Sequence, residues 1–283
     1  MARFQNDCYF YNALQDQGPV LLILKEGKPD SMEKTLFDLL VWLWISAAMI
    51  IFIVLLFITA PYGRHSKRTW GVTIPDRLGW FLMEIPAPII YLLLVITGSA
   101  PKTVTVWIIT GLYLLHYINR AIIYPLRIRT RGKEMPLVVA LMAIFFNFVN
   151  AGFLGYYMGS LQTHYTMAWL IDPRFLTGLL IFVTGMAINM TSDNKLIHLR
   201  KKKGNGYQVP KGGLFEKISC PNLFGEIVEW GGYALLCWSL PALSFFIWTF
   251  CNLVPRALSH HRWYRSHFTN YPAGRKAVLP FIL

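Results

Sequence analysis

Long apolar runs are the feature that most restricts how this chain can fold. Stretches of about 20 residues with few charges recur along it, and this is the length that an α-helix needs to cross a bilayer. Of the 283 residues, 55% are hydrophobic and only 14% are charged, which is too apolar for an ordinary soluble domain. The sequence therefore predicts an all-α, polytopic membrane protein.

We predict seven membrane-spanning helices. Five apolar runs have the length of single spans, whereas the last run is too long for one crossing. We divide that run at Pro241, because proline lacks the N–H group that would continue a helix. Residues 1–34 are expected to form an N-terminal extension and residues 35–283 one seven-helix domain. The predicted spans are residues 35–60, 77–97, 101–125, 136–160, 173–192, 222–239 and 241–266.

Basic residues gather on one side of this arrangement. Lys and Arg occur in the predicted loops 61–76, 126–135 and 193–221 and in the C-terminal tail, whereas loops 98–100 and 161–172 contain none. Cytoplasmic loops of membrane proteins collect Lys and Arg, so we expect the C-terminus in the cytoplasm and the N-terminus outside. The same bias accounts for the net charge of +13 without a nucleic-acid partner.

Neither a metal site nor a nucleotide-binding loop is indicated. The four cysteines, Cys8, Cys220, Cys237 and Cys251, lack the spacing of metal ligands and do not suggest a disulfide framework. The chain has no glycine-rich fingerprint between a strand and a helix and no P-loop sequence. A nucleotide would therefore have to be held by the helices.

Polar residues with helical spacing mark the predicted cytoplasmic ends of three spans. Residues three or four apart share a helix face, and polar groups within a span usually face the protein interior, so we expect these three faces to meet. They consist of Asn189, Asp193 and Arg200 in the fifth span, Asn222, Glu226, Glu229 and Tyr233 in the sixth, and Arg256, His260 and Tyr264 in the seventh.

Two interpretations of these polar faces are open. A buried polar network can serve only to fix how the helices pack. We favour a binding site for a large anionic ligand, because the faces combine arginines and a histidine with carboxylates and amides. The guanidinium group of arginine can donate to two phosphate oxygens at once.

Glu84 and Tyr117 lie deeper in their spans. Each is seven or eight residues from the cytoplasmic end, which corresponds to roughly 10–12 Å at 1.5 Å per residue. A carboxyl group removed from water favours its protonated form, so the two side chains could both donate hydrogen bonds to a carbonyl oxygen. Alternatively, Glu84 is only a packing contact between helices, with a backbone carbonyl freed by Pro86 as its partner.

Six segments of the chain carry a family resemblance: "WFLMEIPAP", "LLHYINRAIIYP", "GMAINMTSD", "VPKGGLFEKISCPNLFGEIVEWGGYALLCWSLPALSF", "RALSHHRWYRSHF" and "YPAGRKAVLPFIL". They resemble the steroid 5α-reductase family, including its plant members. The resemblance covers about residues 80–283 and implies a seven-helix membrane reductase. Such an enzyme uses NADPH to reduce the 4,5 double bond of 4-ene-3-keto steroids, with hydride added to the carbon β to the ketone.

The resemblance also implies roles for single residues. Glu84 and Tyr117 would polarise the steroid ketone as catalytic residues, and Trp80 would line the steroid pocket. The protein would lie in the endoplasmic reticulum membrane of a eukaryote or the cytoplasmic membrane of a bacterium. NADPH would be bound mainly within residues 189–276, by Asn189, Asp193, Arg200, Tyr207, Asn222, Glu226, Arg256, His260, Tyr264 and Arg275.

Other functions remain as alternatives. A related membrane reductase of polyprenols or enoyl thioesters would use the same cofactor with a long aliphatic substrate. A membrane methyltransferase would bind S-adenosylmethionine instead, and a lipid-binding protein or carrier would perform no chemistry. Ser259 and Gln208 stand where vertebrate members of the family have histidine and arginine, a difference that bears on substrate preference.

Overall fold

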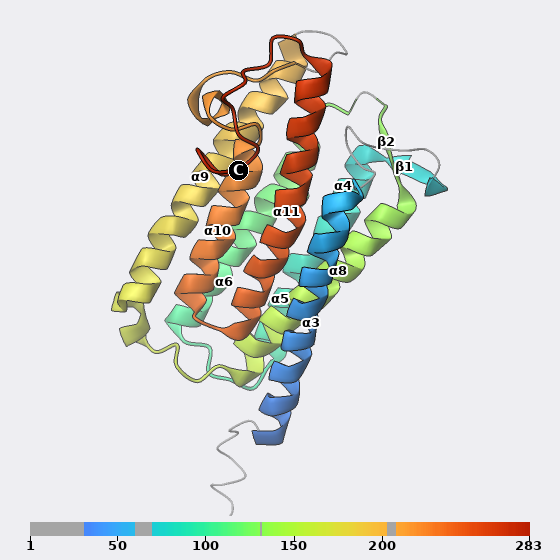
Figure 1. Ribbon diagram of the computed structural model, residues 1–283. Coiled ribbons are helices and arrows are strands. Elements are labelled where there is room, and N and C mark those ends of the chain that lie inside the picture. The colour runs from blue at the N-terminus through green and yellow to red at the C-terminus, as the bar shows by residue number, and fades with distance from the viewer. Residues whose placement is uncertain (1–30, 60–69, 131, 203–207) are drawn as a thin grey trace, which may run out of the picture.

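The computed structural model describes residues 31–59, 70–130, 132–202 and 208–283, and these ranges form a bundle of long helices (Figure 1). Two three-residue strands, β1 (Thr73–Pro75) and β2 (Glu134–Pro136), pair in antiparallel fashion at one end. The helices, in chain order, are α3 (Ser31–Phe57), α4 (Asp76–Glu84), α5 (Pro86–Thr97), α6 (Val104–Tyr117), the π-helical η3 (Ile118–Ile123), α7 (Tyr124–Arg127), α8 (Leu137–Tyr156), the π-helical η4 (Tyr157–Leu161), the 3-10 helix η5 (Met167–Ile171), α9 (Pro173–Lys202), the 3-10 helix η6 (Gly213–Glu216), α10 (Pro221–Cys237) and α11 (Leu240–His267).

Helices occur in all seven predicted spans, but not all have the length of a span. Within the described residues, six helical stretches are long and apolar enough to cross a membrane. The helix outside this set is α10, which has 17 residues and packs between α9 and α11. The six stretches are residues 32–57, 76–97, 104–127, 137–161, 173–200 and 240–267.

Two prolines mark the ends of helices. The division predicted at Pro241 is confirmed, because α10 ends at Cys237 and Pro241 lies in the first turn of α11. The predicted span 77–97 is instead two helices, α4 and α5, which meet at Ile85. Pro86 has no N–H to donate to the carbonyl four residues earlier, which explains the interruption. Glu84 is thus the last residue of a broken helix.

The prediction that the loop after the second span contains no basic residue is wrong. Because α6 begins only at Val104, Lys102 belongs to this loop and not to the following span. Its ammonium group donates hydrogen bonds to the carbonyl oxygens of Gly98 at 3.0 Å, Ala100 at 2.6 Å and Gly159 at 2.7 Å. Lys102 therefore ties together two helix ends, a structural role that charge counting does not reveal.

Close packing of α9 against α10 is made possible by glycines. A Cβ atom at Gly185 of α9 would clash with the backbone of Glu229, and one at Gly225 of α10 would clash with the backbone of Asn189. Small residues at such positions let two helix backbones approach closely. This contact brings the predicted polar faces of α9 and α10 together.

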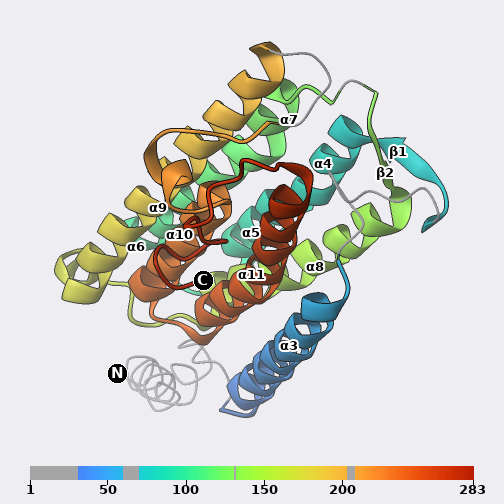
Figure 2. The ribbon, with the colours of Figure 1, turned by 45° about the horizontal axis from the view of Figure 1, so that its top comes forward.

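The outer surface of the bundle is apolar. Large hydrophobic side chains on several helices are more than half exposed, among them Leu43 and Ile50 on α3, Phe145 and Phe148 on α8, and Leu180 on α9. Such extended apolar faces suit contact with lipid. In Figures 1 and 2, α3 lies on the outside of the bundle and packs against α11.

The C-terminal segment after α11 folds back over the end of the bundle (Figure 1). The backbone N–H of Ser219 donates to the carbonyl of Lys276 at 2.8 Å, and that of Cys220 donates to Ala277 at 3.1 Å. These bonds fix the C-terminal segment beside the start of α10. Basic residues near the C-terminus thereby reach the same end of the molecule as the polar face of α10.

Candidate active site

Arg120 lies at the centre of a cluster of acidic side chains. Its guanidinium group is within 3.8 Å of the Glu84 carboxyl, 3.5 Å of Asp193 and 3.6 Å of Glu226. The Arg120 side chain is only 12% exposed. This buried arginine and its three carboxyl partners connect α4, η3, α9 and α10. We call the four residues Glu84, Arg120, Asp193 and Glu226 the Arg120 cluster.

A π-helical stretch and two aromatic rings position Arg120. The residue lies in η3, between α6 and α7, and π-helical turns of this kind are frequent at functional sites. The guanidinium lies over the rings of Trp80, at 4.7 Å, and Tyr124, at 5.0 Å. Such contacts add a favourable cation–π attraction. Trp80, predicted to line the steroid pocket, thus lies directly beside the cluster.

The polar faces of α9 and α10 meet, as their spacing predicted. The Asn189 amide donates to the carbonyl oxygen of Asn222 at 3.0 Å and to the Glu226 carboxyl at 3.4 Å. The Asn222 amide donates to Asp193 at 3.1 Å. Four of the predicted cofactor-binding residues therefore form one network, which the Arg120 cluster extends towards Glu84.

Glu84 and Tyr117 approach each other through a third residue, Asn147 of α8. The Asn147 amide donates a hydrogen bond of 2.6 Å to the carbonyl oxygen of Met83, the neighbour of Glu84, and also interacts with the Glu84 carboxyl. The Tyr117 hydroxyl donates to the amide oxygen of Asn147 at 3.5 Å. A carboxyl group and a phenol from separate helices therefore share one region of the interior.

Glu229 belongs to a different contact from Glu226. Its carboxyl is fully buried and lies 2.8 Å from Nδ1 of His116 on α6. Tyr233, predicted on the same polar face, has its hydroxyl 3.3 Å from that of Tyr91. The predicted face of α10 thus divides: Asn222 and Glu226 face the Arg120 cluster, while Glu229 and Tyr233 lie in the core. The helix is buried on more than one side, so polar residues at helical spacing need not share one partner.

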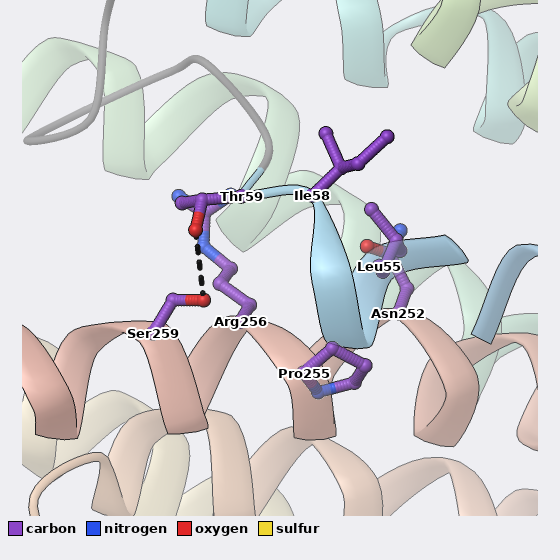
Figure 3. Close-up of a pocket in the computed structure, with 7 residues that line it drawn as sticks. All are labelled: Leu55, Ile58, Thr59, Asn252, Pro255, Arg256 and Ser259. Atoms are coloured by element: carbon purple, nitrogen blue, oxygen red, sulfur yellow. Dashed lines mark hydrogen bonds between the residues drawn. The ribbon is translucent and has the colours of Figure 1, made fainter. Parts of the chain in front are cut away.

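Arg256 lines a pocket between α11 and the end of α3 (Figure 3). The pocket is small, with a cavity volume of about 10 Å³, and is lined by seven residues. Across it, the hydroxyls of Thr59 and Ser259 are 3.3 Å apart. The lining residues are Leu55, Ile58, Thr59, Asn252, Pro255, Arg256 and Ser259.

Arg275 is buried in the C-terminal segment. Its Nη1 donates to the carbonyl oxygen of Pro210 at 3.2 Å, and its guanidinium lies 5.0 Å from the ring of Tyr271. Tyr271 in turn stacks on Tyr264, with ring centroids 5.4 Å apart. Nε and Nη2 of Arg275 have no hydrogen-bond acceptor within the described residues, although Nη2 lies 3.8 Å from the Glu216 carboxyl. This buried guanidinium therefore has donors available for an anion.

The remaining predicted cofactor residues have different surroundings. Arg200 is exposed near the end of α9, and His260 is partly buried on α11. Tyr207 lies outside the described residues. The structure thus brings Asn189, Asp193, Asn222 and Glu226 together, and pairs Tyr264 with Arg275 around Tyr271.

Three residues of this region were missed in the sequence: Arg120, His116 and Asn147. A signal for Arg120 was present, because an arginine within a predicted span is costly and usually functional. His116 and Asn147 are also polar residues within apolar runs, but this signal is weaker than that of a charged arginine. Their partners come from other helices, so no spacing along one helix indicates them.

The side chains of the site combine amide, carboxyl and guanidinium groups. Amides and carboxyl groups of α9 and α10 can pair with hydroxyl and amide groups, and the nearby arginines can pair with phosphate. Within the described ranges, no group of His, Cys, Asp and Glu side chains has the arrangement of a metal site. Beside these groups lie a carboxyl and a phenol that could contact a carbonyl oxygen.

Comparison with known proteins identifies close relatives. A family model described as 3-oxo-5-alpha-steroid 4-dehydrogenase matches residues 133–283. The chain is 41% identical over 254 residues to steroid 5-alpha-reductase DET2 of Gossypium hirsutum, which covers 88% of this chain and 98% of that protein. It is 39% identical over 255 residues to 3-oxo-5-alpha-steroid 4-dehydrogenase 1 of Bos taurus, and this match covers 89% of this chain and 98% of the bovine protein. The Homo sapiens protein of the same name is 41% identical over 226 residues, which cover 78% of this chain and 85% of the human protein. The resemblance seen in the sequence is confirmed.

Proposed function

Since the chain belongs to the steroid 5α-reductase family, whose members are oxidoreductases acting on CH–CH bonds, we propose that it reduces 4-ene-3-keto steroids with NADPH. The product would be the 5α-3-ketosteroid. The observation that carries this proposal is the approach of Tyr117, through Asn147, to Glu84, which is a member of the Arg120 cluster.

The proposed role of Glu84 and Tyr117 is to bind the steroid ketone. Both would donate hydrogen bonds to its oxygen and stabilise the negative charge that develops there as the double bond is reduced. The Arg120 cluster has one guanidinium for three carboxyl groups. Repulsion among buried carboxylates favours protonation of one of them, and we assign that proton to Glu84.

NADPH would be held at the end of the bundle where α9, α10, α11 and the C-terminal segment meet. Asn189, Asn222, Asp193 and Glu226 supply amide and carboxyl groups for the uncharged parts of the cofactor. The unsatisfied donors of the buried Arg275 guanidinium support a phosphate contact at that residue. Arg200, Arg256, Tyr207, His260 and Tyr264 complete the proposed set. When bound, NADPH supplies the hydride that reduces the steroid.

The membrane arrangement that fits this function has seven helices. We assign α10 as the remaining span, the sixth in chain order, because it packs antiparallel to α9 and leads from the cytoplasmic end of α9 back to the start of α11. The basic loops and the cofactor residues would then lie on the cytoplasmic side, and the N-terminus outside. In the opposite orientation, the proposed cofactor site would not be accessible to NADPH from the cytoplasm.

The direct test of the activity is NADPH consumption by purified, detergent-solubilised protein with a small panel of 4-ene-3-keto steroids. Matched 4,5-saturated ketones serve as the control, because they lack the bond to be reduced. Oxidation of NADPH with the enones alone, together with recovery of a 5α product, supports the proposal. Binding of the steroids without any NADPH oxidation would contradict it.

A further inference from the structure

Asn147 is the buried polar residue that connects the two proposed ketone-binding groups. It lies on α8, is 5% exposed, and contacts both the end of α4 and the Tyr117 hydroxyl. We propose that Asn147 is a positioning residue: anchored to the end of α4, it holds the Tyr117 hydroxyl at the ketone site. This inference rests on the proposed function, because it requires Tyr117 to act on the substrate.

The hydrogen bonds of Asn147 determine the orientation of its amide. A carbonyl oxygen can only accept, so the contact of 2.6 Å with Met83 must involve the NH₂ group of Asn147. The amide oxygen of Asn147 then faces Tyr117, whose hydroxyl must be the donor in that contact. The short bond anchors Asn147 to the last turn of α4, one residue from Glu84.

The second bond is long enough to be exchanged. At 3.5 Å, the contact between the Tyr117 hydroxyl and Asn147 is at the limit of hydrogen bonding and therefore weak. This weak hydrogen bond orients the phenol and gives its hydroxyl proton an acceptor that can readily be replaced. A ketone oxygen placed at closer range would take over the proton, so the amide orients the hydroxyl before the substrate binds and gives it up to the ketone.

The position of Asn147 relative to both helices supports this role over simple packing. The broken end of α4 at Ile85 has fewer helical hydrogen bonds to fix it, because Pro86 lacks an N–H group. The bond from Asn147 gives the Met83 carbonyl, in this same last turn, a hydrogen-bond partner from another helix. Groups that act on a reacting atom must be held to within about half an ångström, and a single residue that contacts both helices sets their relative position.

Asn150 provides a matched control on the same helix. It is also buried, donates to the Phe146 carbonyl at 2.8 Å and accepts from the Trp44 indole at 3.2 Å. It belongs to none of the proposed cofactor or ketone contacts. The substitution Asn150→Leu therefore removes a buried amide from α8 without removing the anchor of Tyr117.

The experiment measures single-turnover reduction of a 4-ene-3-keto steroid at saturating NADPH, with NADPH affinity measured in parallel. Asn147→Leu is compared with the unchanged protein, and the same substitution is then made in a Tyr117→Phe background. We expect Asn147→Leu to slow turnover by about 10-fold or more, since small misplacements of reacting groups have effects of this size. In the Tyr117→Phe background its further effect should stay within about twofold, because the hydroxyl it positions is already absent. NADPH affinity and the rate of Asn150→Leu should remain near those of the unchanged protein.

The other outcomes contradict either this inference alone or the proposed role of Tyr117 together with it. An equal fold-loss from Asn147→Leu in both backgrounds would show that Asn147 only supports packing, and would overturn this inference while leaving Tyr117 in place. A normal rate for Asn147→Leu would overturn it as well. A normal rate for Tyr117→Phe alone would overturn the proposed function of Tyr117 and this inference with it. If Asn147→Leu does not fold, the smaller Asn147→Ala decides by the same comparison.

Discussion

The guanidinium group of Arg120 lies 3.6 Å from the carboxyl group of Glu226, although the two residues belong to distant parts of the chain. The same guanidinium reaches Glu84 and Asp193. One side chain thus joins the helix that carries the proposed ketone-binding carboxyl to the two helices that carry the proposed cofactor site.

The first prediction concerns Arg120. Arg120→Met keeps an unbranched side chain but leaves three carboxyl groups without their cation, and breaking a buried ion pair from one side typically costs about 3–5 kcal/mol. We expect a lower melting temperature in detergent and weaker NADPH binding. The control is Arg127→Met, because Arg127 is exposed and donates a hydrogen bond of 2.7 Å to an uncharged partner, Asn194. Equal melting temperatures for the two variants would contradict the central position of Arg120.

The second prediction concerns the contact between α9 and α10. Gly225→Ala places a Cβ against the backbone of Asn189, so the two helices must separate. We expect lower thermal stability and weaker NADPH binding. The control is Gly111→Ala on α6, where a Cβ would meet nothing within 4 Å. That variant should be neutral or more stable, by up to about 1 kcal/mol, because alanine is the better helix former. Unchanged NADPH affinity in Gly225→Ala would argue that the α9–α10 spacing does not define the cofactor site.

Hydropathy and proline position predicted most of the helices, because both act locally. The turn before Pro241 and the polar faces of Asn189 and Glu226 could be read from the sequence for the same reason. The break at Ile85 was missed, since the apolar run continues through it. The β1–β2 pair was also missed, because strands of three residues show no periodicity. Within α9, the helix continues to Lys202, well beyond the apolar residues that defined the predicted span.

The least predictable part of the site was the choice of partners between helices. Glu226 and Glu229 are separated by one turn and looked alike in the sequence, yet one contacts Arg120 and the other His116. The importance of Arg120 was missed because this residue lies within a predicted span, whereas only the charges of the loops were used for the prediction. Which side chains meet depends on how the helices pack, and the pattern along one helix does not contain that information.

The third prediction is a preference for NADPH over NADH. The proposed cofactor site contains Arg200, Arg256 and Arg275, and a guanidinium group binds the additional phosphate of NADPH well. Titration at physiological salt should give a lower Kd for NADPH. The variant Arg275→Leu should weaken NADPH binding, because it removes a buried guanidinium with unsatisfied donors. Equal affinities for the two cofactors would contradict this prediction.

The fourth prediction is the orientation in the membrane. A reporter fused after Leu283 should be detected on the cytoplasmic side, and a reporter placed at the N-terminus on the opposite side. This follows from seven crossings with the basic loops in the cytoplasm. Detection of both reporters on the same side would mean an even number of spans, and α10 would then not cross the membrane.

The fifth prediction separates cofactor binding from chemistry. Glu226→Gln should weaken NADPH binding, because it removes a charge from the network of Arg120 and Asn189. Glu84→Gln and Tyr117→Phe should leave that affinity nearly intact and slow the reaction instead. If both groups act on one oxygen, the double variant should lose less than the product of the two single effects. A packing role for Glu84 makes a different prediction, namely that Glu84→Gln keeps its activity while Glu84→Leu mainly lowers thermal stability.

The most direct measurement is the single-turnover rate of Glu84→Gln with saturating NADPH and a 4-ene-3-keto steroid. An amide is a poorer hydrogen-bond donor to a developing enolate than a carboxylic acid. We therefore predict a rate lower by about 10²–10³, the usual cost of removing one such donor, with NADPH affinity unchanged. A rate equal to that of the unchanged protein would contradict the assignment of Glu84 as a catalytic residue.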